Sequence, residues 1–188
     1  NLFNISLALE RQGLRTEMVD DLASASELDG LILPGVGNFG PAISKLRRCR
    51  EPMTDILAKG KPILGICLGM QLLFDSSEEG TADGLGILKG RVLRLPGFVK
   101  IPHIGWNQLR IKRGSSIVDG IEQDSWVYFV HSYYPSADNS VVVAETEYGV
   151  TFPSVVESGG LVGTQFHPEK SGETGRRLLD NFARLLRR

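Results

Sequence analysis

Hydrophobic positions near the start of the chain recur every three or four residues. Residues 2–9 follow this spacing, which predicts a helix that ends at Gly13. Residues 41–50 and 52–59 carry the same spacing, interrupted by polar positions. We therefore expect several helices in the first third of the chain, each with one buried side.

Two continuous apolar runs separate these helical segments. GLILP (residues 30–34) and PILGI (62–66) are typical of buried strands, and residues 17–19 predict a further short strand. Strands that alternate with helices in this way predict an α/β fold, with a mostly parallel central sheet covered by helices on both faces. Because such folds usually begin with a strand and a helix opens this chain, we expect the first strand to lie before Asn1.

After about residue 86 the chain becomes richer in strands. Alternating or continuous apolar segments follow one another without helices between them: GILKGRVLRLP, WVYFVHSYY, SVVVAETEYG and LVGTQF. Residues 173–186 then place their leucines on one stripe, which predicts a closing amphipathic helix. With 188 residues, the chain is expected to form a single domain over residues 1–188.

Charge and cysteine content exclude several classes of protein. The 21 basic and 22 acidic residues give a net charge of −1, so the basic surface of a nucleic-acid-binding protein is not expected. Two cysteines do not make a disulfide scaffold, and no Cys-x-x-Cys or histidine cluster offers metal ligands. No apolar stretch approaches the ~18 residues that span a membrane. We expect no metal, no cofactor and a reducing, cytoplasmic location.

Cys67 follows the second apolar run and stands between two glycines, in the sequence GICLG (65–69). A strand, a small-x-nucleophile-x-small turn and a helix together are typical of a nucleophile elbow, in which Gly65 and Gly69 allow strand and helix to approach closely. The N-terminal end of the following helix would favour the thiolate. The alternative is that Cys67 is a small buried hydrophobic residue, the commonest role of a free cysteine.

A nucleophilic cysteine needs a general base, which the sequence QFHPE (165–169) offers. His167 and Glu169 are two residues apart, so in an extended segment their side chains point to the same side. Pro168 favours that conformation, because the residue before a proline avoids the helical region. Glu169 is thus expected to orient His167, although a lone histidine at a strand end more often has a surface or capping role.

A third element would stabilise the oxyanion of a tetrahedral intermediate. The glycine-rich segment PGVGNFG (34–40) follows a predicted strand, and the backbone N–H of Leu68 follows the nucleophile, so both offer donors. The segment could equally be an ordinary strand-to-helix loop. As a phosphate-binding loop it lacks both G-x-G-x-x-G and a Walker lysine. Cys49 has neither a base nor an elbow and is not expected to be catalytic. His103 and His131 have no paired carboxylate in the local sequence and are expected to be packing or hydrogen-bonded residues.

GICLGMQ (65–71) together with QFHPE (165–169) resembles the class I glutamine amidotransferases, a family with a Cys-His-Glu triad. Four further segments are similar to one branch of this family, the glutaminase subunits of imidazole glycerol phosphate synthase: PGVGNFG, KIPHIGWN, YFVHSYY and HPEKSG. The resemblance extends over essentially the whole chain. It implies hydrolysis of L-glutamine to glutamate and ammonia, and a heterodimer in which ammonia passes to a cyclase subunit in L-histidine biosynthesis.

The resemblance also implies roles for individual residues. Cys67 would be the nucleophile, His167 the acid and base, and Glu169 the orienting carboxylate. The other residues carried over from the family motifs form three groups: Gly35, Val36 and Leu68 at the oxyanion site; Gln71 and the backbone of Ser132 and Tyr133 at the amino-acid end of glutamine; and Trp106, Tyr128 and Lys170 at the cyclase interface. For Trp106 and Tyr128, core packing is an equal alternative.

Other readings of the chain stay open at this point. The triad alone also fits glutaminases that serve anthranilate, guanylate or pyridoxal phosphate synthesis, and the PGVG and PHIGWN segments favour the histidine pathway over them. A stand-alone cysteine hydrolase would need no partner. A catalytically silent binding subunit would be favoured by loss of a triad residue, and here Cys67, His167 and Glu169 are all present.

Overall fold

The computed structural model describes residues 2–19, 22, 28–35, 37–80 and 82–187. The helices, including short 3-10 helices marked η, are α1 Leu2–Glu10, α2 Phe39–Leu46, η2 Arg47–Cys49, α3 Arg50–Ala58, α4 Leu68–Gln71, η3 Ser116–Val118, η4 Pro168–Lys170 and α5 Gly172–Leu185. The strands are β1 Leu31–Gly35, β2 Ile63–Cys67, β3 Ser76–Ser77, β4 Gly90–Arg94, β5 His103–Gln108, β6 Arg110–Ile111, β7 Trp126–His131, β8 Tyr133–Ala137, β9 Val142–Glu147, β10 Thr151–Ser158 and β11 Leu161–Thr164.

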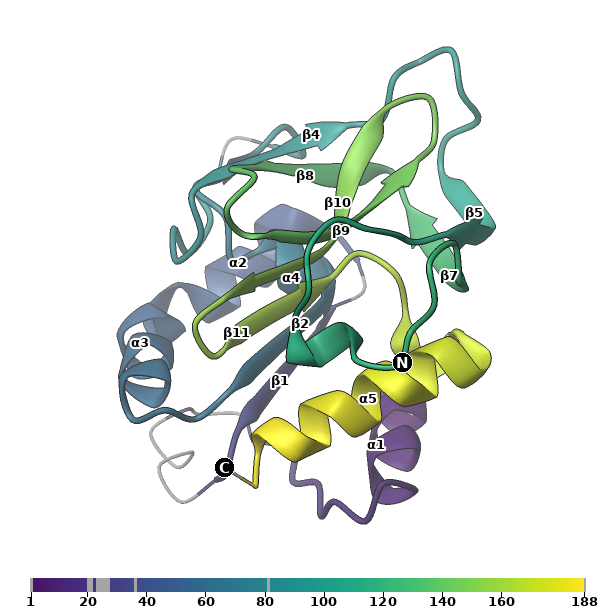
Figure 1. Cartoon of the computed structure of the whole chain (residues 1–188). Helices are drawn as coiled ribbons and strands as arrows, with labels where there is room; N and C mark the ends of the chain where they lie inside the picture. The colour runs from purple at the N-terminus through teal and green to yellow at the C-terminus, as the bar shows by residue number, and fades with distance from the viewer. Residues whose placement is uncertain (1, 20–21, 23–27, 36, 81, 188) are drawn as a thin grey trace.

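A six-stranded sheet in the order β1-β2-β11-β10-β9-β6 forms the centre of the molecule (Figure 1). β2 lies between β1 and β11 and pairs with both in parallel, whereas the other three pairings are antiparallel. The α/β fold is thus confirmed, but among the described strands the sheet is mixed where a mostly parallel one was expected. The reason is that the second half of the chain forms its strands as neighbouring hairpins, without crossover helices.

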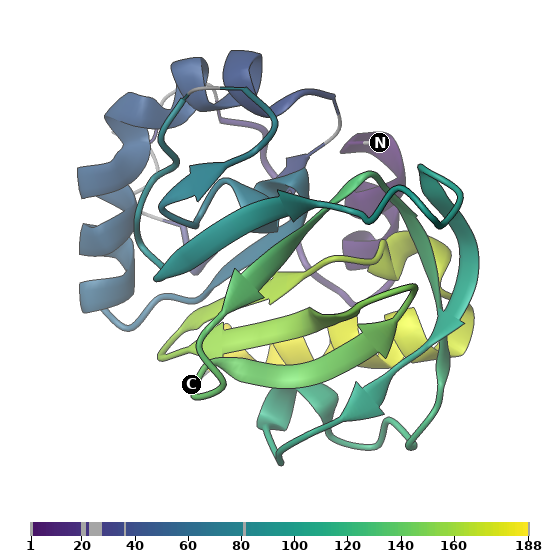
Figure 2. The same ribbon diagram turned by 90° about the horizontal axis from the view of Figure 1, so that it is seen from above.

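Helices cover both faces of this sheet, as the hydrophobic pattern predicted. α1 and α5 pack on one face, over a core that includes Phe152, Phe166 and Phe182. On the other face α2, α3 and α4 pack over a second core around Phe39 and Phe74. Figures 1 and 2 show α1 with α5 on one side and α2 with α3 on the other. β2 ends between these two layers, so its last residue lies inside the molecule.

Two smaller sheets flank the central one. β3, β4 and β8 form one, and β5 pairs with β7 to form the other. β5 and β10 were not expected from the sequence. Pro153 lies within β10, and proline normally argues against a central strand; the register of β10 against β9 shifts between Pro153 and Val155, and this irregularity accommodates it. The expected strand at residues 17–19 is wrong, since these residues carry no strand structure and so short a run is weak evidence.

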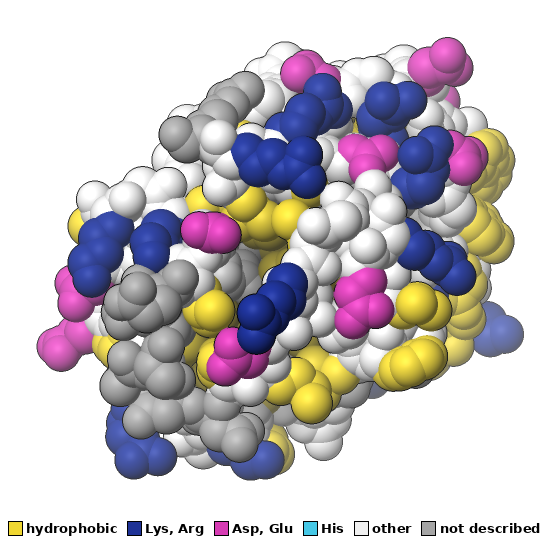
Figure 3. Space-filling view, turned by 90° about the horizontal axis from the view of Figure 1, so that it is seen from below, with side chains coloured by type: hydrophobic (Ala, Val, Ile, Leu, Met, Phe, Trp, Pro, Cys, Tyr) yellow, Lys and Arg dark blue, Asp and Glu magenta, His cyan; other side chains and the backbone are white. Residues whose placement is uncertain are grey.

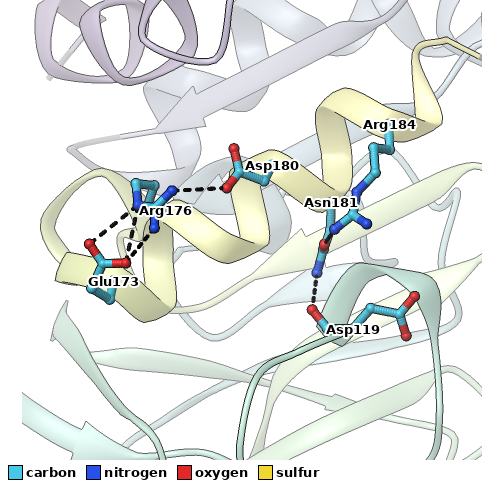
Figure 4. Close-up of polar contacts among 6 residues, drawn as sticks. All are labelled: Asp119, Glu173, Arg176, Asp180, Asn181 and Arg184. Carbon is cyan, nitrogen blue, oxygen red and sulfur yellow. Dashed lines mark hydrogen bonds and ion pairs between the residues drawn. The ribbon is translucent and has the colours of Figure 1, made fainter.

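The closing helix α5 is tied to the segment around η3. The side-chain amide of Asn181 donates to the carbonyls of Ile117 and Asp119, both at 2.9 Å, and Arg184 donates to its side-chain oxygen (Figure 4). Arg176 also forms ion pairs with Glu173 and Asp180 on the exposed side of the same helix.

On the face drawn in Figure 3, Lys and Arg side chains lie interspersed with Asp and Glu. This mixture agrees with the balanced composition. Within the described ranges, no helix is both long and apolar enough to cross a membrane.

Candidate active site

Cys67 lies at the end of β2, on a sharp turn into α4. Its backbone has φ 52° and ψ −111°, a left-handed conformation that a non-glycine residue adopts only when its surroundings impose it. A Cβ on Gly69 would lie 1.8 Å from the carbonyl oxygen of Leu33 in β1, and a Cβ on Gly65 would lie 2.9 Å from that of Gly69. The two glycines therefore allow the close approach expected of a nucleophile elbow.

The helix behind the elbow is short. α4 contains four residues, so it aligns few peptide dipoles toward the sulfur. The stabilisation of a Cys67 thiolate by the N-terminal end of this helix is accordingly small, so neighbouring side chains have to supply more of it. The Cys67 Sγ lies 3.8 Å from the carbonyl oxygen of Val130, to which a thiol can donate, and 3.6 Å from Nε2 of Gln165, from which it accepts.

His167 and Glu169 form a buried pair: Nδ1 lies 2.9 Å from Oε1, and both side chains are almost fully enclosed. His167 is extended at the end of the strand segment, but Pro168–Lys170 forms η4, so a tight turn rather than a continuous extended segment brings the two side chains together. The backbone of His167 is fixed as well. Its N–H donates to the carbonyl of Tyr128, and its carbonyl accepts from the hydroxyl of Ser171.

The electrostatics of this pair favour a charged imidazole. Burial by itself lowers the pKa of His167, but Cys67 and Glu169 on its two sides outweigh burial and raise the pKa to about 9. Burial by itself raises the pKa of Glu169, but the hydrogen bond and charge of His167 outweigh burial and hold this pKa below the ordinary value of a glutamate. Nε2 of His167 is buried and makes no hydrogen bond to any described group. It is therefore the ring atom left for a reacting group.

Cys67 and His167 open into a cavity of about 290 Å³, a size suited to a small molecule. The residues that line it come from distant parts of the chain: Gly35, Gly37, Asn38, Cys67, Leu68, Gln71, Glu79, Pro102, Val130, His131, Ser132, Tyr133 and His167. Gly35 and Leu68, two of the expected oxyanion residues, both line it. Leu68 is the first residue of α4, so the helix itself cannot use its N–H. Val36, the third, lies outside the described residues.

The residues expected to hold the amino-acid end of glutamine also meet in this cavity. Gln71 donates through Nε2 to the carbonyl of Tyr133 at 2.8 Å and to Oε1 of Gln165 at 3.0 Å. Both of its N–H bonds are thus in use, and only Oε1 remains to accept from a ligand. The carbonyl of Tyr133 also accepts from Nδ1 of His131 at 2.9 Å, so its two acceptor positions are filled. Ser132, which lies between His131 and Tyr133 in the chain, also lines the cavity.

Glu79 is a cavity residue that the sequence reasoning missed. Its Oε2 accepts from the backbone N–H of Phe39 at the start of α2, and the residue lines the same cavity as Gln71. No motif surrounds it in the sequence SSEEG, so the only available signal was a carboxylate in a polar loop shortly after the elbow. Its charge makes it a natural partner for an ammonium group.

Trp106, Tyr128 and Lys170 lie together outside the cavity. Trp106 and Tyr128 are directly paired across β5 and β7 with their rings 5.9 Å apart, and Lys170 Nζ lies 5.8 Å from the centre of the Tyr128 ring. Trp106 is 52% exposed, which excludes core packing for it, while Tyr128 is half-buried. Ile104 (58% exposed) and Trp126 (54%) add to the same sheet. We call these five residues the β5–β7 face.

His103 and His131 are structural, as expected. Their rings are hydrogen-bonded to each other at 2.9 Å, and burial lowers the pKa of His103 to about 4 and that of His131 to about 3. Over the part of the chain that the structure describes, no group of three His, Cys, Asp or Glu residues could hold a metal ion.

Comparison with known proteins places the chain in a family. The model of the family "Glutamine amidotransferase class-I" matches residues 2–185. The imidazole glycerol phosphate synthase subunit HisH of Aquifex aeolicus is 51% identical, over 98% of this chain and 91% of its own length. HisH of Halobacterium salinarum is 46% identical, over 97% of this chain and 87% of its own.

A solved structure supports the fold. The crystal structure of a protein named glutamine amidotransferase is 21% identical, covers 100% of this chain and 95% of its own length, and superposes with a TM-score of 0.76. The resemblance drawn from the elbow and QFHPE motifs is confirmed over nearly the whole length: the chain belongs to the class I glutamine amidotransferase family.

Proposed function

We propose that this protein is the glutaminase component of an imidazole glycerol phosphate synthase, which hydrolyses L-glutamine to glutamate and ammonia. The observation that carries the proposal is that the strained Cys67 lines one small cavity together with His167, which is itself paired with Glu169. The branch of the family is supported by relatives named imidazole glycerol phosphate synthase subunit HisH at 46 to 51% identity. We infer in addition that residues 1–188 form one domain and that the protein acts in the cytoplasm.

In the proposed reaction the Cys67 thiolate attacks the side-chain amide carbon of glutamine. The resulting oxyanion accepts hydrogen bonds from backbone N–H groups near Leu68 and Gly35, with Val36 as a further expected member. Imidazolium His167 gives its proton to the departing nitrogen, and ammonia leaves a glutamyl thioester. His167 then removes a proton from water, which attacks the thioester and releases glutamate and the thiolate. The raised pKa of His167 suits the first of these proton transfers.

The cavity wall supplies opposite chemistry for the two charged groups of the substrate. Oε1 of Gln71 and the carboxylate of Glu79 can accept from the α-ammonium group. The α-carboxylate needs hydrogen-bond donors, which would be backbone N–H groups around Ser132 and Tyr133. The Tyr133 carbonyl takes no part in substrate binding, because it already accepts from Gln71 and His131.

We propose that the β5–β7 face binds the cyclase subunit, to which ammonia is delivered. Exposed aromatic and aliphatic side chains in a row are unusual on a surface that stays in water, and an interface core is typically rich in aromatic residues. Lys170 adds a charge beside them. It also belongs to η4 with Glu169, so the same short helix joins the proposed interface to the triad.

The test of the function is release of glutamate from glutamine by the protein. Activity is measured for the protein alone and with the cyclase of imidazole glycerol phosphate synthase together with the ligand of that cyclase. We expect strong stimulation by the cyclase that is absent in Cys67→Ala. Equal activity with and without the cyclase would point to a stand-alone hydrolase and contradict the synthase assignment. Absence of activity under both conditions would contradict the glutaminase assignment itself.

The interface is tested by Trp106→Ala in a titration of the cyclase followed by light scattering or calorimetry. An exposed aromatic anchor at an interface centre is worth about 2 kcal/mol, so affinity should fall by roughly 30-fold. Met18→Ala, which truncates an exposed hydrophobic side chain outside β5 and β7, is the control and should bind normally. Unchanged affinity in Trp106→Ala would place the cyclase on another surface.

A further inference from the structure

Gln165 is completely buried, and its side chain lies between Cys67 and Gln71. It follows β11, and its backbone N–H donates to the carbonyl of Ser154 at 3.0 Å. Its side chain bridges two residues of the site. Nε2 lies 3.6 Å from the Cys67 sulfur, and Oε1 accepts from Nε2 of Gln71 at 3.0 Å. The roles assigned so far to the QFHPE segment belong to His167 and Glu169, and neither role involves the side chain of Gln165.

The orientation of the Gln165 amide follows from the groups around it. The carbonyl of Tyr133 can only accept, so the atom of Gln71 that faces it at 2.8 Å is the nitrogen. That nitrogen also faces Gln165, which must present its oxygen there. The Gln165 nitrogen is thereby left facing Cys67, and a flipped amide would set two donors against each other.

The Tyr133 carbonyl is itself fixed from a second side. Asn107 Nδ2 donates to the Glu147 carbonyl at 3.0 Å and lies 3.4 Å from Nε2 of His103, which is therefore an acceptor. His103 then donates from Nδ1 to His131, and His131 donates from Nδ1 to Tyr133, both at 2.9 Å. Each ring carries one proton, which agrees with the low pKa of both histidines. The Tyr133 carbonyl thus accepts from two sides, from His131 at the end of the Asn107–His103–His131 network and from Gln71.

We propose that Gln165 stabilises the thiolate of Cys67 by donating to its sulfur, and that Gln71 acts as the positioning residue that keeps the Gln165 amide in this orientation. The inference rests on the proposed function, in which Cys67 is the nucleophile. An N–H donor favours the thiolate, whereas the Val130 carbonyl on the same sulfur can only accept and favours the thiol. Since α4 is a single turn, this side-chain donor supplies part of what a longer helix would provide.

The test is the rate at which iodoacetamide alkylates Cys67 at pH 7 in the natural protein, without glutamine or cyclase, with peptide mass spectrometry to separate Cys67 from Cys49. Gln165→Met keeps the length of the side chain but removes the donor, and we expect alkylation about tenfold slower, as for one weak hydrogen bond to a charged group. Gln165→Glu should be slower still, because an oxygen would face the thiolate. Thr164→Val is the control, since it removes a neighbouring buried hydrogen bond to Phe166 without contact to the sulfur, and it should react as the wild type does.

Gln71→Met tests the positioning role, because it frees the Gln165 amide to turn; we expect alkylation roughly threefold slower, as for partial loss of one hydrogen bond. Wild-type rates in all three Gln variants, with thermal unfolding confirming that they are folded, would overturn the proposal. A wild-type rate in Gln71→Met alone would overturn the positioning role. Slow alkylation of the wild type itself would instead contradict Cys67 as an activated nucleophile, so the two failures are distinguishable.

Discussion

The substitution Glu169→Gln tests how the triad keeps its histidine charged. The side chains of Glu and Gln are nearly the same size, and the amide oxygen of Gln can still accept from Nδ1 of His167, which lies 2.9 Å from Oε1 in the wild type. The negative charge is lost, and the amide NH2 takes the buried place of Oε2, which has no hydrogen-bond partner among the described groups. The imidazolium would then depend on Cys67 alone to balance the cost of burial.

The structure supplies the size of the effect. Raising the pKa of His167 from 6.5 to about 9 corresponds to a net attraction of about 3 kcal/mol for the imidazolium, shared between Cys67 and Glu169. His167 is buried, so solvent does little to screen this attraction. If Glu169 supplies about half, its loss costs about 1.5 kcal/mol, which is roughly a tenfold decrease in kcat/KM and a shift of about one pH unit.

The assay is glutamate release by the cyclase complex between about pH 5.5 and 10, a range that brackets the alkaline limb expected from the pKa of His167. In the wild type we expect kcat/KM to fall at alkaline pH as His167 loses its proton near pH 9. In Glu169→Gln this alkaline limb should lie near pH 8, about one unit lower. The direction follows from the charge, since removing a negative neighbour makes the imidazolium easier to deprotonate.

Glu173→Gln provides the matched control. It makes the same chemical change at an exposed carboxylate that pairs with Arg176 on the surface of α5. Its pH profile and rate should match those of the wild type. The reasoning is refuted if Glu169→Gln loses activity while its alkaline limb stays where the wild type has it, because Glu169 would then act only on geometry.

Three further outcomes follow from the same structure. The raised pKa of His167 stabilises the fold fully below about pH 6.5, and this stabilisation is lost as the pH rises through about 9. The free energy of unfolding measured in urea should therefore be about 3 kcal/mol lower at about pH 10 than at about pH 7. This difference should be missing in His167→Asn. Gly69→Ala places a Cβ against the Leu33 carbonyl and should lower Tm by roughly 10 °C (about 3 kcal/mol), whereas Gly97→Ala, which has open space around it, should not. Asn181→Ala loses the hydrogen bonds to the carbonyls of Ile117 in η3 and of Asp119 just after it; it should destabilise the protein by about 2 kcal/mol in the same urea assay, with unchanged glutaminase activity.

The local chemistry of the site was readable from short stretches of sequence. A cysteine between Gly65 and Gly69 after an apolar run predicts the elbow, because the close approach of strand and helix excludes side chains at those two positions. His167 and Glu169 are near neighbours in the chain, so their pairing needs only a local conformation. The turn that achieves it is tighter than the extended segment expected, yet it brings the same two side chains together.

Sequence spacing could not reveal contacts between distant segments. Gln71 and Tyr133 were expected together only through the family resemblance, and Glu79 belongs to no motif. All three line one cavity because α4, the loop before β4 and the start of β8 converge there. The mixed pairing of the sheet was hidden for a related reason: β10 contains Pro153, and only its partners β9 and β11 make it a strand.

What the amino-acid sequence determined by itself is the set of reacting groups and their local conformation, since backbone preferences and side-chain chemistry act over a few residues. What the tertiary structure decided is the environment of those groups. The donor from Gln165 to Cys67 spans 98 positions of the chain, and the bond from Gln71 to Gln165 spans 94. Such contacts depend on the packing of whole elements, because burial and low dielectric, which give a hydrogen bond or a charge its strength, exist only after the chain has folded.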